Sequence, residues 1–346
     1  MTAPHSLAVI GDGIIGLSAA VALLLEGHRV DLYAADAPGA AWRAAAGMLA
    51  PGGELQGGEP ELIRHAIEAR ALWESWHTRL LENGAEFAMR RTGALLVGPS
   101  HSDRETVALF SALGEPYGLH GVSVSRHDHE ELFSLVSPRV ERGLFYSSDA
   151  AVDPLQVVEA LRDLATTKGI MWRTQAESVR RGVVRGAEGD VQYDRVVVAT
   201  GLRQLPIEDM TVPTIRPVRG ATIMLHEGPL VVGPTIRGYV EGRPFYVVPR
   251  GGGSFCVGAS SEEEEHHLAR AGEIRQLLDD VFAVCPGLRD ARFADVRVGS
   301  RPAIKTNCPL NEISPDGRTL VLGGHYRHGV LFSPLAAQAA VQFAVS

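Results

Sequence analysis

Glycines near the start of the chain form the clearest pattern of residues that could do chemistry. Gly11, Gly13 and Gly16 lie in the string Gly-Asp-Gly-Ile-Ile-Gly, which has the spacing GxGxxG. In a strand-turn-helix unit the first glycine allows a tight turn, the second lets a pyrophosphate approach the backbone, and the third lets the helix pack on the strand. The phosphates lie at the positive end of that helix. The pattern therefore predicts a dinucleotide site, and Ile14 and Ile15 within the string are counted among its cofactor-binding residues.

The residues around these glycines predict the elements that would position them. Leu7 to Ile10 has the apolar character of a strand, and a run of helix formers from Leu17 to Glu26 follows the glycines. Val30 to Tyr33 resumes strand character and completes a βαβ unit. Such a unit usually carries an acidic residue after its second strand, where it binds ribose hydroxyls. Asp36 comes shortly after that strand, and it is either this ribose ligand or an aspartate in a solvated turn.

Further pieces of a nucleotide-binding domain occur in the middle and at the end of the chain. Tyr193 to Gly201 is a second strand that ends in a small turn, and Asp153 to Arg162 is a helix with a capping aspartate and an early proline. Near the C-terminus a strand, Thr319 to Leu322, precedes a turn over Gly323 to Gly329 and a helix from Val330 onward. We therefore predict a discontinuous, Rossmann-like α/β domain that consists of residues 1–81, 147–216 and 298–346.

The intervening segments have a different pattern. Phe245 to Pro249 and Ser254 to Gly258 alternate with a period of two, which is typical of antiparallel strands. Residues 82–146 and 217–297 are therefore predicted to form a second, substrate-binding domain of the α+β class on an antiparallel sheet. Within it, the acidic run Glu262 to Glu265 is interpreted as the solvated start of a helix.

The composition limits the class of protein. The chain has 346 residues, 45% of them hydrophobic, which is enough for a sizeable core and about two domains. Its 33 Lys and Arg against 41 Asp and Glu give a net charge of -8, so no basic field is available to hold nucleic acid or an anionic membrane. The longest apolar run, Ile14 to Leu25, is shorter than the roughly 20 residues that span a bilayer. We expect no nucleic-acid partner and no membrane span.

The cysteines and the N-terminus bear on metal binding and location. Cys256, Cys285 and Cys308 are widely spaced and form no CxxC or Cys/His array, so we expect neither a disulfide framework nor a metal site. Met1 to Ser6 contains neither the basic stretch nor the small-residue cleavage site of a secretory signal. These features favour a reducing, cytoplasmic location.

Several short strings, taken together in chain order, resemble the FAD-dependent D-amino acid oxidase and glycine oxidase superfamily. The resemblance covers nearly the whole chain and is greatest to the glycine oxidases of the thiamine pathway. It implies an oxidoreductase that binds FAD non-covalently. The strings are Gly11 to Gly16, Ala44 to Pro51, Val196 to Gly201, Arg216 to Gly220, Tyr246 to Arg250 with Val257 to Ala259, Arg301-Pro302, and Gly324 to Gly329.

The resemblance also implies where the flavin lies. The segment around Gly47 follows the second strand, where small residues let the backbone approach the flavin ring. The loop from Gly324 to Gly329 precedes the final helix, so its amides and the helix dipole face the N1 and O2 edge of the flavin, where negative charge develops on reduction. Besides Gly11 to Gly16 and Asp36, the residues implied to bind FAD are Ala45, Ala46, Gly47, Met48, Thr200, Gly201, Gly324, His325, Tyr326, Arg327, His328, Gly329 and Val330.

For the substrate, the resemblance implies that Arg301 binds a carboxylate, which a guanidinium can do with two charge-assisted hydrogen bonds. Tyr246 is similar to the family's active-site tyrosine, although an aromatic residue in an alternating strand is also compatible with core packing. Arg327 would lie where flavin and substrate meet. Met48 would lie over the active site, unless it fills a gap in the core.

The implied reaction transfers a hydride from the substrate Cα to flavin N5. The amine enters unprotonated, so that no strong protein base is needed. Dioxygen then reoxidises the flavin to give hydrogen peroxide, and the imine hydrolyses to an oxo acid.

The sequence departs from the glycine oxidase pattern at several positions. After Arg301-Pro302 the usual glycine, threonine and aspartate are replaced by Ala303 to Leu310, and His328 stands where these oxidases usually carry asparagine. Within this stretch, Lys305 either favours a second substrate carboxylate or faces solvent, and Cys308 is offset from the cysteine that binds flavin covalently in sarcosine oxidases. Pro244 occupies a position where a polar side chain could have contacted the substrate.

Alternatives therefore remain open on the residues alone. The substrate is a small amino acid or amine, and a D-amino acid oxidase or a sarcosine-type amine oxidase differs from a glycine oxidase mainly in pocket volume. In other classes, an NAD(P)-dependent dehydrogenase shares the βαβ start, and a non-catalytic flavoprotein could keep the same fold. A homo-oligomer is also compatible with the sequence, because pattern alone does not separate exposed apolar patches from core.

Overall fold

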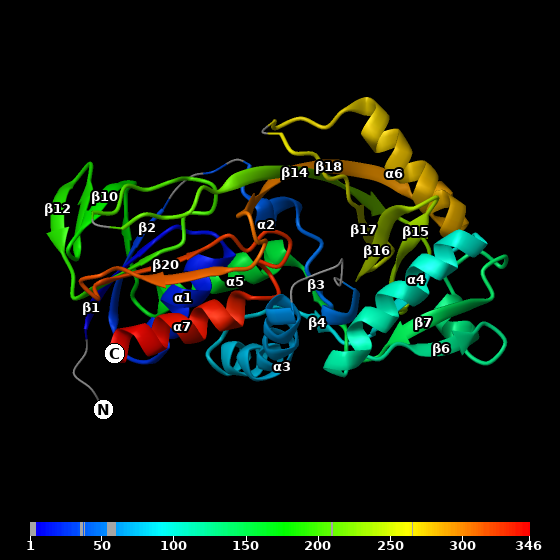
Figure 1. The fold of residues 1–346 in the computed structure, drawn as a ribbon, viewed down its shortest axis with the longest axis horizontal. Helices are drawn as coiled ribbons and strands as arrows, with labels where there is room; N and C mark the ends of the chain where they lie inside the picture. Colours follow the sequence, from blue (N-terminus) through cyan, green and yellow to red (C-terminus); the bar gives the residue numbers. More distant parts are fainter. Residues whose placement is uncertain (1–4, 35–36, 38, 54–59, 209, 265) are drawn as a thin grey trace.

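The computed structural model describes residues 5–34, 37, 39–53, 60–208, 210–264 and 266–346. Two large sheets lie next to each other along the long axis of the molecule, the sheet with the N-terminal strand on the left of Figure 1 and the sheet with β14 to β18 on the right. The chain passes between them several times, so each sheet is assembled from segments that are distant in the sequence.

The first sheet has the strand order β19-β20-β13-β1-β2-β9. Neighbouring strands from β20 to β9 are parallel, and β19 joins the edge in antiparallel orientation. This is the predicted Rossmann-like arrangement, with the glycine turn directly after β1. The strands are β1 (Ser6–Ile10), β2 (Arg29–Tyr33), β9 (Met171–Arg173), β13 (Arg195–Val198), β19 (Leu310–Ile313) and β20 (Thr319–Gly323).

Different structures cover the two faces of this sheet. Leu7 and Val9 pack in one core with helices, and Ala8 and Ile10 pack in another core beneath a three-stranded meander. The central strands are therefore apolar on both faces, as buried parallel strands must be. The helices are α1 (Ile14–Leu25), α3 (Pro60–Glu82), α5 (Pro154–Thr167) and α7 (Ser333–Val345), and the meander is β10 (Ala176–Arg180), β11 (Val183–Gly186) and β12 (Gly189–Gln192).

Two predicted helix starts differ from the structure. Helix α1 begins at Ile14 instead of Leu17, because the helix starts inside the glycine string. Helix α7 begins at Ser333 instead of Val330, because residues 330–332 form turns. The capping aspartate of α5 is confirmed, since Asp153 accepts a hydrogen bond from the N–H of Leu155 at 3.0 Å.

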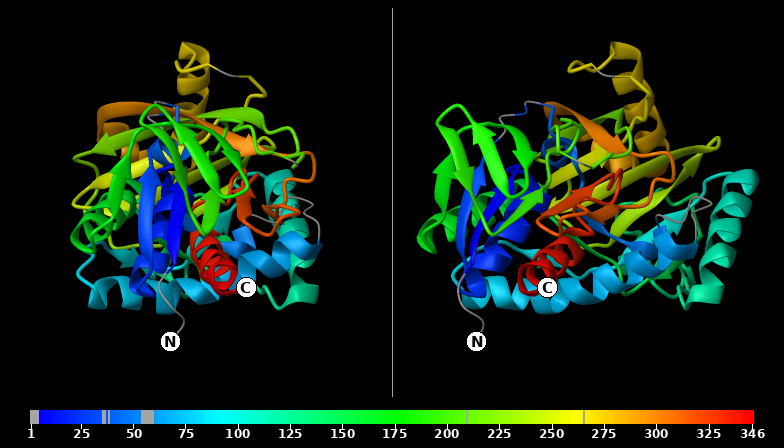
Figure 2. Two further views of the ribbon diagram at one scale, coloured as in Figure 1. Left: turned by 90° about the vertical axis from the view of Figure 1, so that its left-hand side faces the viewer. Right: turned by 60° about the vertical axis from the view of Figure 1, so that its left-hand side comes forward.

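The second sheet has the order β18-β14-β17-β16-β15-β5-β7-β6. It is antiparallel, as predicted, except that β15 and β5 are parallel. In both views of Figure 2, α6 lies against this sheet on the side away from α7. The elements are β5 (Ala94–Val97), β6 (Val122–Ser125), β7 (Arg142–Tyr146), β14 (Arg216–His226), β15 (Thr235–Val240), β16 (Arg243–Gly251), β17 (Ser254–Gly258), β18 (Arg292–Ala303), α4 (His101–Gly114) and α6 (Ala271–Val284).

Short elements join the two sheets. A three-stranded sheet of order β3-β8-β4 and the helix α2 (Ala41–Ala44) follow the glycine-rich first unit. The remaining elements are β3 (Met48–Leu49), β4 (Met89–Arg90), β8 (Ala150–Val152), η1 (Pro51–Gly53), η2 (Glu115–Tyr117), η3 (Glu130–Phe133) and η4 (Pro286–Asp290).

The structure confirms the predicted fold class of an α/β part with a second, largely antiparallel part. The predicted division between residues 297 and 298 falls within β18, which continues unbroken to Ala303. The interpretation of Glu262 to Glu265 as a helix start is wrong, because α6 begins only at Ala271. Glu264 instead binds a buried arginine, as described below.

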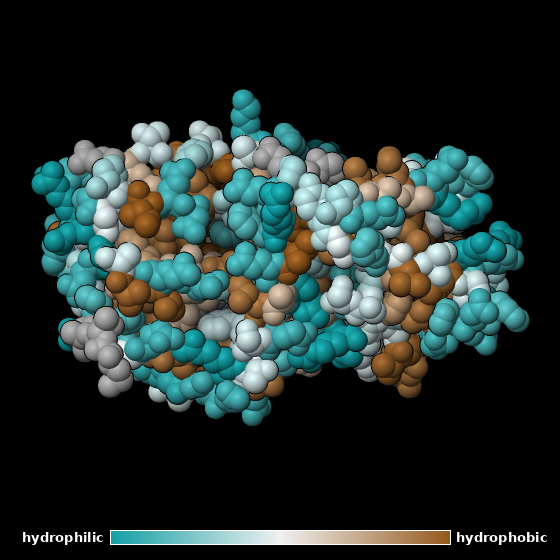
Figure 3. Space-filling model, turned by 60° about the horizontal axis from the view of Figure 1, so that its bottom comes forward, coloured by the Kyte–Doolittle hydropathy of each residue, from teal (hydrophilic) through white to brown (hydrophobic). Residues whose placement is uncertain are grey.

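Exposed apolar side chains are dispersed over the surface. The face in Figure 3 shows hydrophobic residues in several separate groups among hydrophilic ones. Large exposed hydrophobic residues lie on distant elements, for example Leu109, Met171 and Phe293. In the described part of the chain, no helix combines the length and the hydropathy that a membrane crossing requires.

Candidate active site

The glycine turn between β1 and α1 leaves no room for side chains at two of its glycines. A Cβ on Gly11, whose φ is +116°, would lie 2.7 Å from the carbonyl carbon of Ala199 and closer still to its oxygen. A Cβ on Gly16 would lie 2.9 Å from the carbonyl carbon of Gly11, again with the oxygen closer. A Cβ on Gly13 would make only ordinary contact with Trp42, at 3.5 Å. The protein itself therefore requires Gly11 and Gly16, whereas the space at Gly13 is available to a ligand.

The first turn of α1 presents backbone N–H groups to the cavity. Gly13 is the N-cap, no described side chain caps the helix, and its first turn has no acidic residue. Asp12 in the turn is held by Arg162 of α5, at 2.8 Å. Unsatisfied N–H groups and the helix dipole attract an anion such as a phosphate. The turn therefore fits the diphosphate of a dinucleotide.

The loop that contains Gly47 is fixed from the second sheet. Arg250 of β16 donates to the carbonyl oxygens of Ala46 at 2.7 Å and Val152 at 2.6 Å. Gly47 has a φ of +69°, and a Cβ there would lie 2.8 Å from Pro154 Cδ and closer to the Val152 carbonyl oxygen. The backbone of this loop is thus held close to the cavity with little side-chain bulk.

Met48 and Tyr246 pack against one apolar cluster at the cavity wall. Met48 begins β3 and Tyr246 lies on β16, and both pack partly buried against an apolar cluster that includes Val248 and Cys256. Both residues also line the cavity. The sequence leaves core packing and a place in the active site as alternatives for each residue. In the structure, each of the two residues both packs in the core and lines the cavity.

Arg301 lies near the end of the edge strand β18, with its guanidinium over the backbone of β14. A Cβ on Gly220 would lie 2.6 Å from Arg301 Cζ, so a side chain there would displace the guanidinium. Arg301 Nη1 donates to the carbonyl of Arg219 at 3.3 Å, and Nη2 donates to the carbonyl of Ser260 at 3.2 Å. These bonds hold the guanidinium at the cavity wall.

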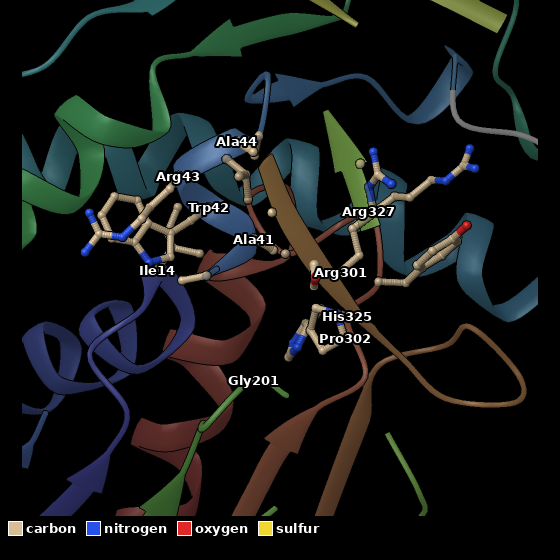
Figure 4. Close-up of a pocket in the computed structure, with 18 of the residues that line it drawn as sticks. Ile14, Ala41, Trp42, Arg43, Ala44, Gly201, Arg301, Pro302, His325 and Arg327 are labelled. Atoms are coloured by element: carbon tan, nitrogen blue, oxygen red, sulfur yellow. The ribbon is translucent and has the colours of Figure 1, made fainter. Parts of the chain in front are cut away.

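The loop between β20 and α7 is tied to the end of β18. The N–H of Tyr326 donates to the carbonyl of Pro302 at 2.8 Å. Arg327 lies beside this bond, with its guanidinium 5.1 Å from the centre of the Tyr326 ring and Nη2 3.4 Å from Ser261 Oγ. Figure 4 shows Arg327 next to Arg301 at the same end of the cavity. Two arginines, one on β18 and one in the loop before α7, therefore face one region.

His325 is an uncharged member of this loop. It is 6% exposed, and burial, with a smaller contribution from His328, lowers the pKa of its imidazole to about 4. The side chain is therefore neutral near pH 7 and adds no charge to the cavity. His328 is also buried, with its ring 5.2 Å from that of Phe332, so it packs behind the loop.

A cavity of about 520 Å³ connects these elements. Figure 4 shows Ile14, Trp42 and Arg43 on one side of it and Arg301 and Arg327 on the other. Of the predicted site residues, Gly16, Gly324 and His328 do not line it, and Asp36 lies outside the described residues. Its wall contains Gly11, Gly13, Ile14, Ile15, Ala45, Ala46, Gly47, Met48, Thr200, Gly201, Tyr246, Arg301, His325, Tyr326, Arg327, Gly329 and Val330.

The cavity also contains residues that the sequence analysis missed. Arg43 is exposed, with its guanidinium 4.5 Å from the centre of the Trp42 ring, and both residues line the cavity on the same side as Ile14. Arg237 is 9% exposed and lies beside Tyr246 in the register of β15 and β16. No local motif marks Trp42 or Arg43. The signal for Arg237 is a charged residue in an otherwise buried strand, Thr235 to Val240.

Positive charge predominates in the cavity wall. Among its described residues the only carboxylate is Asp12, which is paired with Arg162. None of these lining residues is a cysteine, and the described chain contains no group of His, Cys, Asp and Glu side chains that could hold a metal ion. The cavity is therefore suited to anionic ligands. The lining arginines are Arg43, Arg203, Arg237, Arg301 and Arg327.

Comparisons with known proteins point to one family. The model of the family described as FAD dependent oxidoreductase (DAO) matches residues 6–343. A protein of Rhizobium etli, whose proposed role is that of the thiamine biosynthesis oxidoreductase ThiO, is 29% identical over 95% of this chain and 93% of its own length. The bifunctional protein ThiO/ThiG of Trichormus variabilis is 27% identical over 99% of this chain. This chain spans only 53% of that relative.

A solved structure has the same fold. The glycine oxidase of Geobacillus kaustophilus superposes with a TM-score of 0.86 over 99% of this chain and 95% of its own, at 22% identity. At that identity the likeness shows the fold alone. It confirms that the parallel sheet and the mixed sheet occur together in an established arrangement.

Proposed function

The chain belongs to the family of FAD dependent oxidoreductases, and from this membership we propose that it oxidises the carbon–nitrogen bond of a small amino acid or secondary amine. The observation that carries the proposal is the end of the cavity where Arg301 and Arg327 lie together. Relatives that are named as glycine oxidases or ThiO make glycine the first substrate to test.

The residues present fit FAD. The first turn of α1 suits the diphosphate, because it offers backbone N–H groups and has space at Gly13. The loop around Gly47 and the segment from His325 to Val330 would border the flavin, since both bring backbone to the cavity wall. Thr200 and Gly201 complete the wall after β13. Non-covalent binding is supported by the lack of a cysteine among the described lining residues.

The substrate carboxylate would bind Arg301, whose guanidinium is held by two backbone carbonyls at the cavity wall. Tyr246 would donate its phenol hydrogen bond to the same carboxylate, and Arg327 would contribute charge where flavin and substrate meet. Met48, which packs against the same apolar cluster as Tyr246, would cover the reacting carbon. These residues bind and orient the substrate, which is the main contribution of a protein to cofactor chemistry.

The charge of the cavity also favours the reactive form of the amine. Nearby guanidinium groups disfavour an ammonium ion, and the described wall offers no carboxylate at this end to stabilise one. The amine is therefore held unprotonated while its carboxylate is bound. When bound, FAD supplies the acceptor for the hydride that leaves the substrate Cα. Dioxygen would take up the two electrons together with two protons and leave as hydrogen peroxide. Water would hydrolyse the imine to an oxo acid and release ammonia, or a primary amine from a secondary amine substrate.

A D-amino acid or sarcosine is the second substrate candidate. Arg237 adds a buried cation beside Tyr246, and Pro244 and Phe245 also line the cavity. This wall leaves the size of the preferred side chain or N-substituent to experiment. An NAD(P)-dependent dehydrogenase is no longer an alternative, because the family is FAD dependent.

The proposal is tested by anaerobic titration of the purified yellow protein with glycine, sarcosine, D-alanine and D-aspartate. Bleaching of the flavin band by one of them is the expected result and ranks the substrates. A flavin that stays oxidised with all four would contradict oxidation of a small amino acid or amine.

The role of Arg301 is tested separately with Arg301→Ala. Its KM for the carboxylate substrate is expected to rise about 100-fold or more, in line with the loss of a charged hydrogen-bonded pair, while bound FAD remains. Arg297→Ala is the matched control, because Arg297 lies on the same strand but is not among the described lining residues. An unchanged KM in Arg301→Ala would remove Arg301 from the substrate site.

A further inference from the structure

A buried ion network lies directly behind the Arg301 guanidinium. The side chain of Arg219 on β14 is 0% exposed, and it binds Glu273 of α6 through both terminal nitrogens, Nη1 to Oε1 at 3.0 Å and Nη2 to Oε2 at 2.6 Å. Arg219 Nε also donates to Glu264 Oε1 at 2.9 Å. The network therefore joins β14, which lies next to the edge strand β18 of the second sheet, to a helix that packs on that sheet.

Glu273 is the centre of this network. Besides Arg219, it accepts a hydrogen bond from the Ser260 hydroxyl at 2.8 Å and one from the N–H of Arg270 at 3.2 Å. Burial alone would raise the pKa of the Glu273 carboxyl, but the bonds from Arg219 and Ser260 lower it below its usual value. The Ser260 hydroxyl oxygen in turn accepts a hydrogen bond from the N–H of Ala221 at 2.8 Å. Glu273 is therefore a charged carboxylate that fixes both Arg219 on β14 and Ser260 after β17.

Arg219 and Ser260 also hold Arg301 through their backbone carbonyls. Its guanidinium donates to the carbonyls of Arg219 and Ser260, the two residues whose side chains meet at Glu273. Glu273 itself is not among the described residues that line the cavity. The hydrogen-bonded route from Glu273 to Arg301 therefore runs through Arg219 and Ser260.

We propose that Glu273 is a positioning residue for substrate binding. By fixing Arg219 and Ser260, it sets the position of the two carbonyls that aim the Arg301 guanidinium into the cavity. A bidentate guanidinium loses affinity when its plane turns, and a displacement of about 1 Å in such a site can cost about 100-fold in rate. A helix outside the cavity thereby determines the affinity for the substrate carboxylate. This inference rests on the proposed role of Arg301.

The burial of the pair supports a positioning role. A buried ion pair contributes little net stability compared with well-packed apolar residues of the same volume. Apolar residues in place of Arg219 and Glu273 would not orient a functional group. They could not form hydrogen bonds with Ser260 and with the N-terminus of α6, as Glu273 does.

The test compares Glu273→Gln with Asp280→Asn in the FAD-loaded enzyme. Asp280 is the matched control, because it is a buried carboxylate of the same helix whose pair with Arg243, at 2.8 Å, has no bond to the Arg301 carbonyls. Glu273→Gln is expected to raise KM for the carboxylate substrate about tenfold with kcat nearly unchanged. A tenfold change lies within the range of interaction energies measured between directly coupled residues. Asp280→Asn is expected to leave both constants unchanged.

Binding of acetate, an unreactive carboxylate, gives a readout that does not need turnover. Acetate is titrated against the visible spectrum of the bound, oxidised FAD, and its Kd is expected to rise by the same factor in Glu273→Gln. In an Arg301→Ala background, Glu273→Gln should then have no further effect. An unchanged KM and acetate Kd in folded Glu273→Gln, or equal effects with and without Arg301, would overturn the proposal.

Two further outcomes separate the possible failures. If Glu273→Gln does not fold, Arg219→Lys keeps the buried charge but loses the bidentate bond, and the same rise in KM is expected. If Arg301→Ala leaves KM unchanged, the proposed anchor fails and the positioning role fails with it. If Arg301→Ala raises KM and both network variants leave it unchanged, only the positioning role is refuted.

Discussion

The glycines of the first turn are expected to differ in what they are needed for. A Cβ at Gly13 meets only Trp42, at 3.5 Å, so Gly13→Ala fits the protein. Gly13 also has an ordinary φ of -77°. A Cβ at Gly16 lies 2.9 Å from the carbonyl carbon of Gly11, and closer to its oxygen, where no real Cβ is found. If Gly13 leaves space for a diphosphate, Gly13→Ala should impair FAD binding without harming the fold.

The magnitudes follow from these contacts. Alanine is a poorer N-cap than glycine by about 1 kcal/mol, and the lower entropy of its unfolded chain offsets this by about 0.4–1 kcal/mol. The free energy of unfolding of Gly13→Ala should therefore stay within about 1 kcal/mol of wild type. Gly16→Ala forces a methyl group against a backbone carbonyl that cannot rotate away, so it should lose about 3 kcal/mol or more.

The assay is urea unfolding at 25 °C without added FAD, combined with quenching of FAD fluorescence to measure its Kd. Gly13→Ala is expected to weaken FAD binding at least about tenfold, since a methyl group replaces part of the diphosphate space. Equal losses of stability in Gly13→Ala and Gly16→Ala would refute the reasoning about the turn. An unchanged FAD Kd in Gly13→Ala would refute the placement of the diphosphate.

Two further predictions concern charge. The folded protein keeps His325 neutral down to its pKa of about 4, whereas the unfolded chain takes up the proton near pH 6.5. The contribution of His325 to the free energy of unfolding is therefore fully present above pH 6.5 and is lost as the pH falls to 4. That loss is about 3 kcal/mol. The urea midpoint should therefore fall less between pH 7 and pH 4 in His325→Gln than in wild type, and an identical decline in both would contradict a buried neutral imidazole. On the Ile14 side of the cavity, Arg43→Gln should raise the FAD Kd about two- to fivefold at low salt, because an exposed ion pair with a phosphate would be lost. At 1 M NaCl the Kd should be unchanged, because salt screens such a pair. A rise in Kd that does not depend on salt would exclude a phosphate contact.

Local pattern was sufficient to predict the glycine turn between β1 and α1. The spacing of Gly11, Gly13 and Gly16 after an apolar strand predicts the turn because its geometry depends on neighbours within one supersecondary unit. The resemblance carried most of the remaining site, and Arg301, Tyr246 and the residues around Gly47 line the same cavity. Helix boundaries were less accurate, since the start of α7 depends on turns at 330–332 that have no strong sequence signal.

The sequence misjudged the acidic run because charge alone does not indicate a partner. Glu264 resembles a solvated residue in its string of glutamates, yet it binds the fully buried Arg219, which is 45 positions earlier and on another element. Arg237 was missed for a similar reason, because its place beside Tyr246 depends on strand pairing.

The sequence by itself determined the fold class, the glycine turn after β1 and the family, because these depend on local periodicity and on strings of adjacent residues. Only the tertiary structure decided which side chains share the cavity. It brings Arg301 of β18 next to Arg327 of the C-terminal loop. It also pairs Glu273 of α6 with Arg219, whose carbonyl accepts a hydrogen bond from Arg301. The physical reason is that these contacts depend on strand register and helix packing, which join residues from distant parts of the chain.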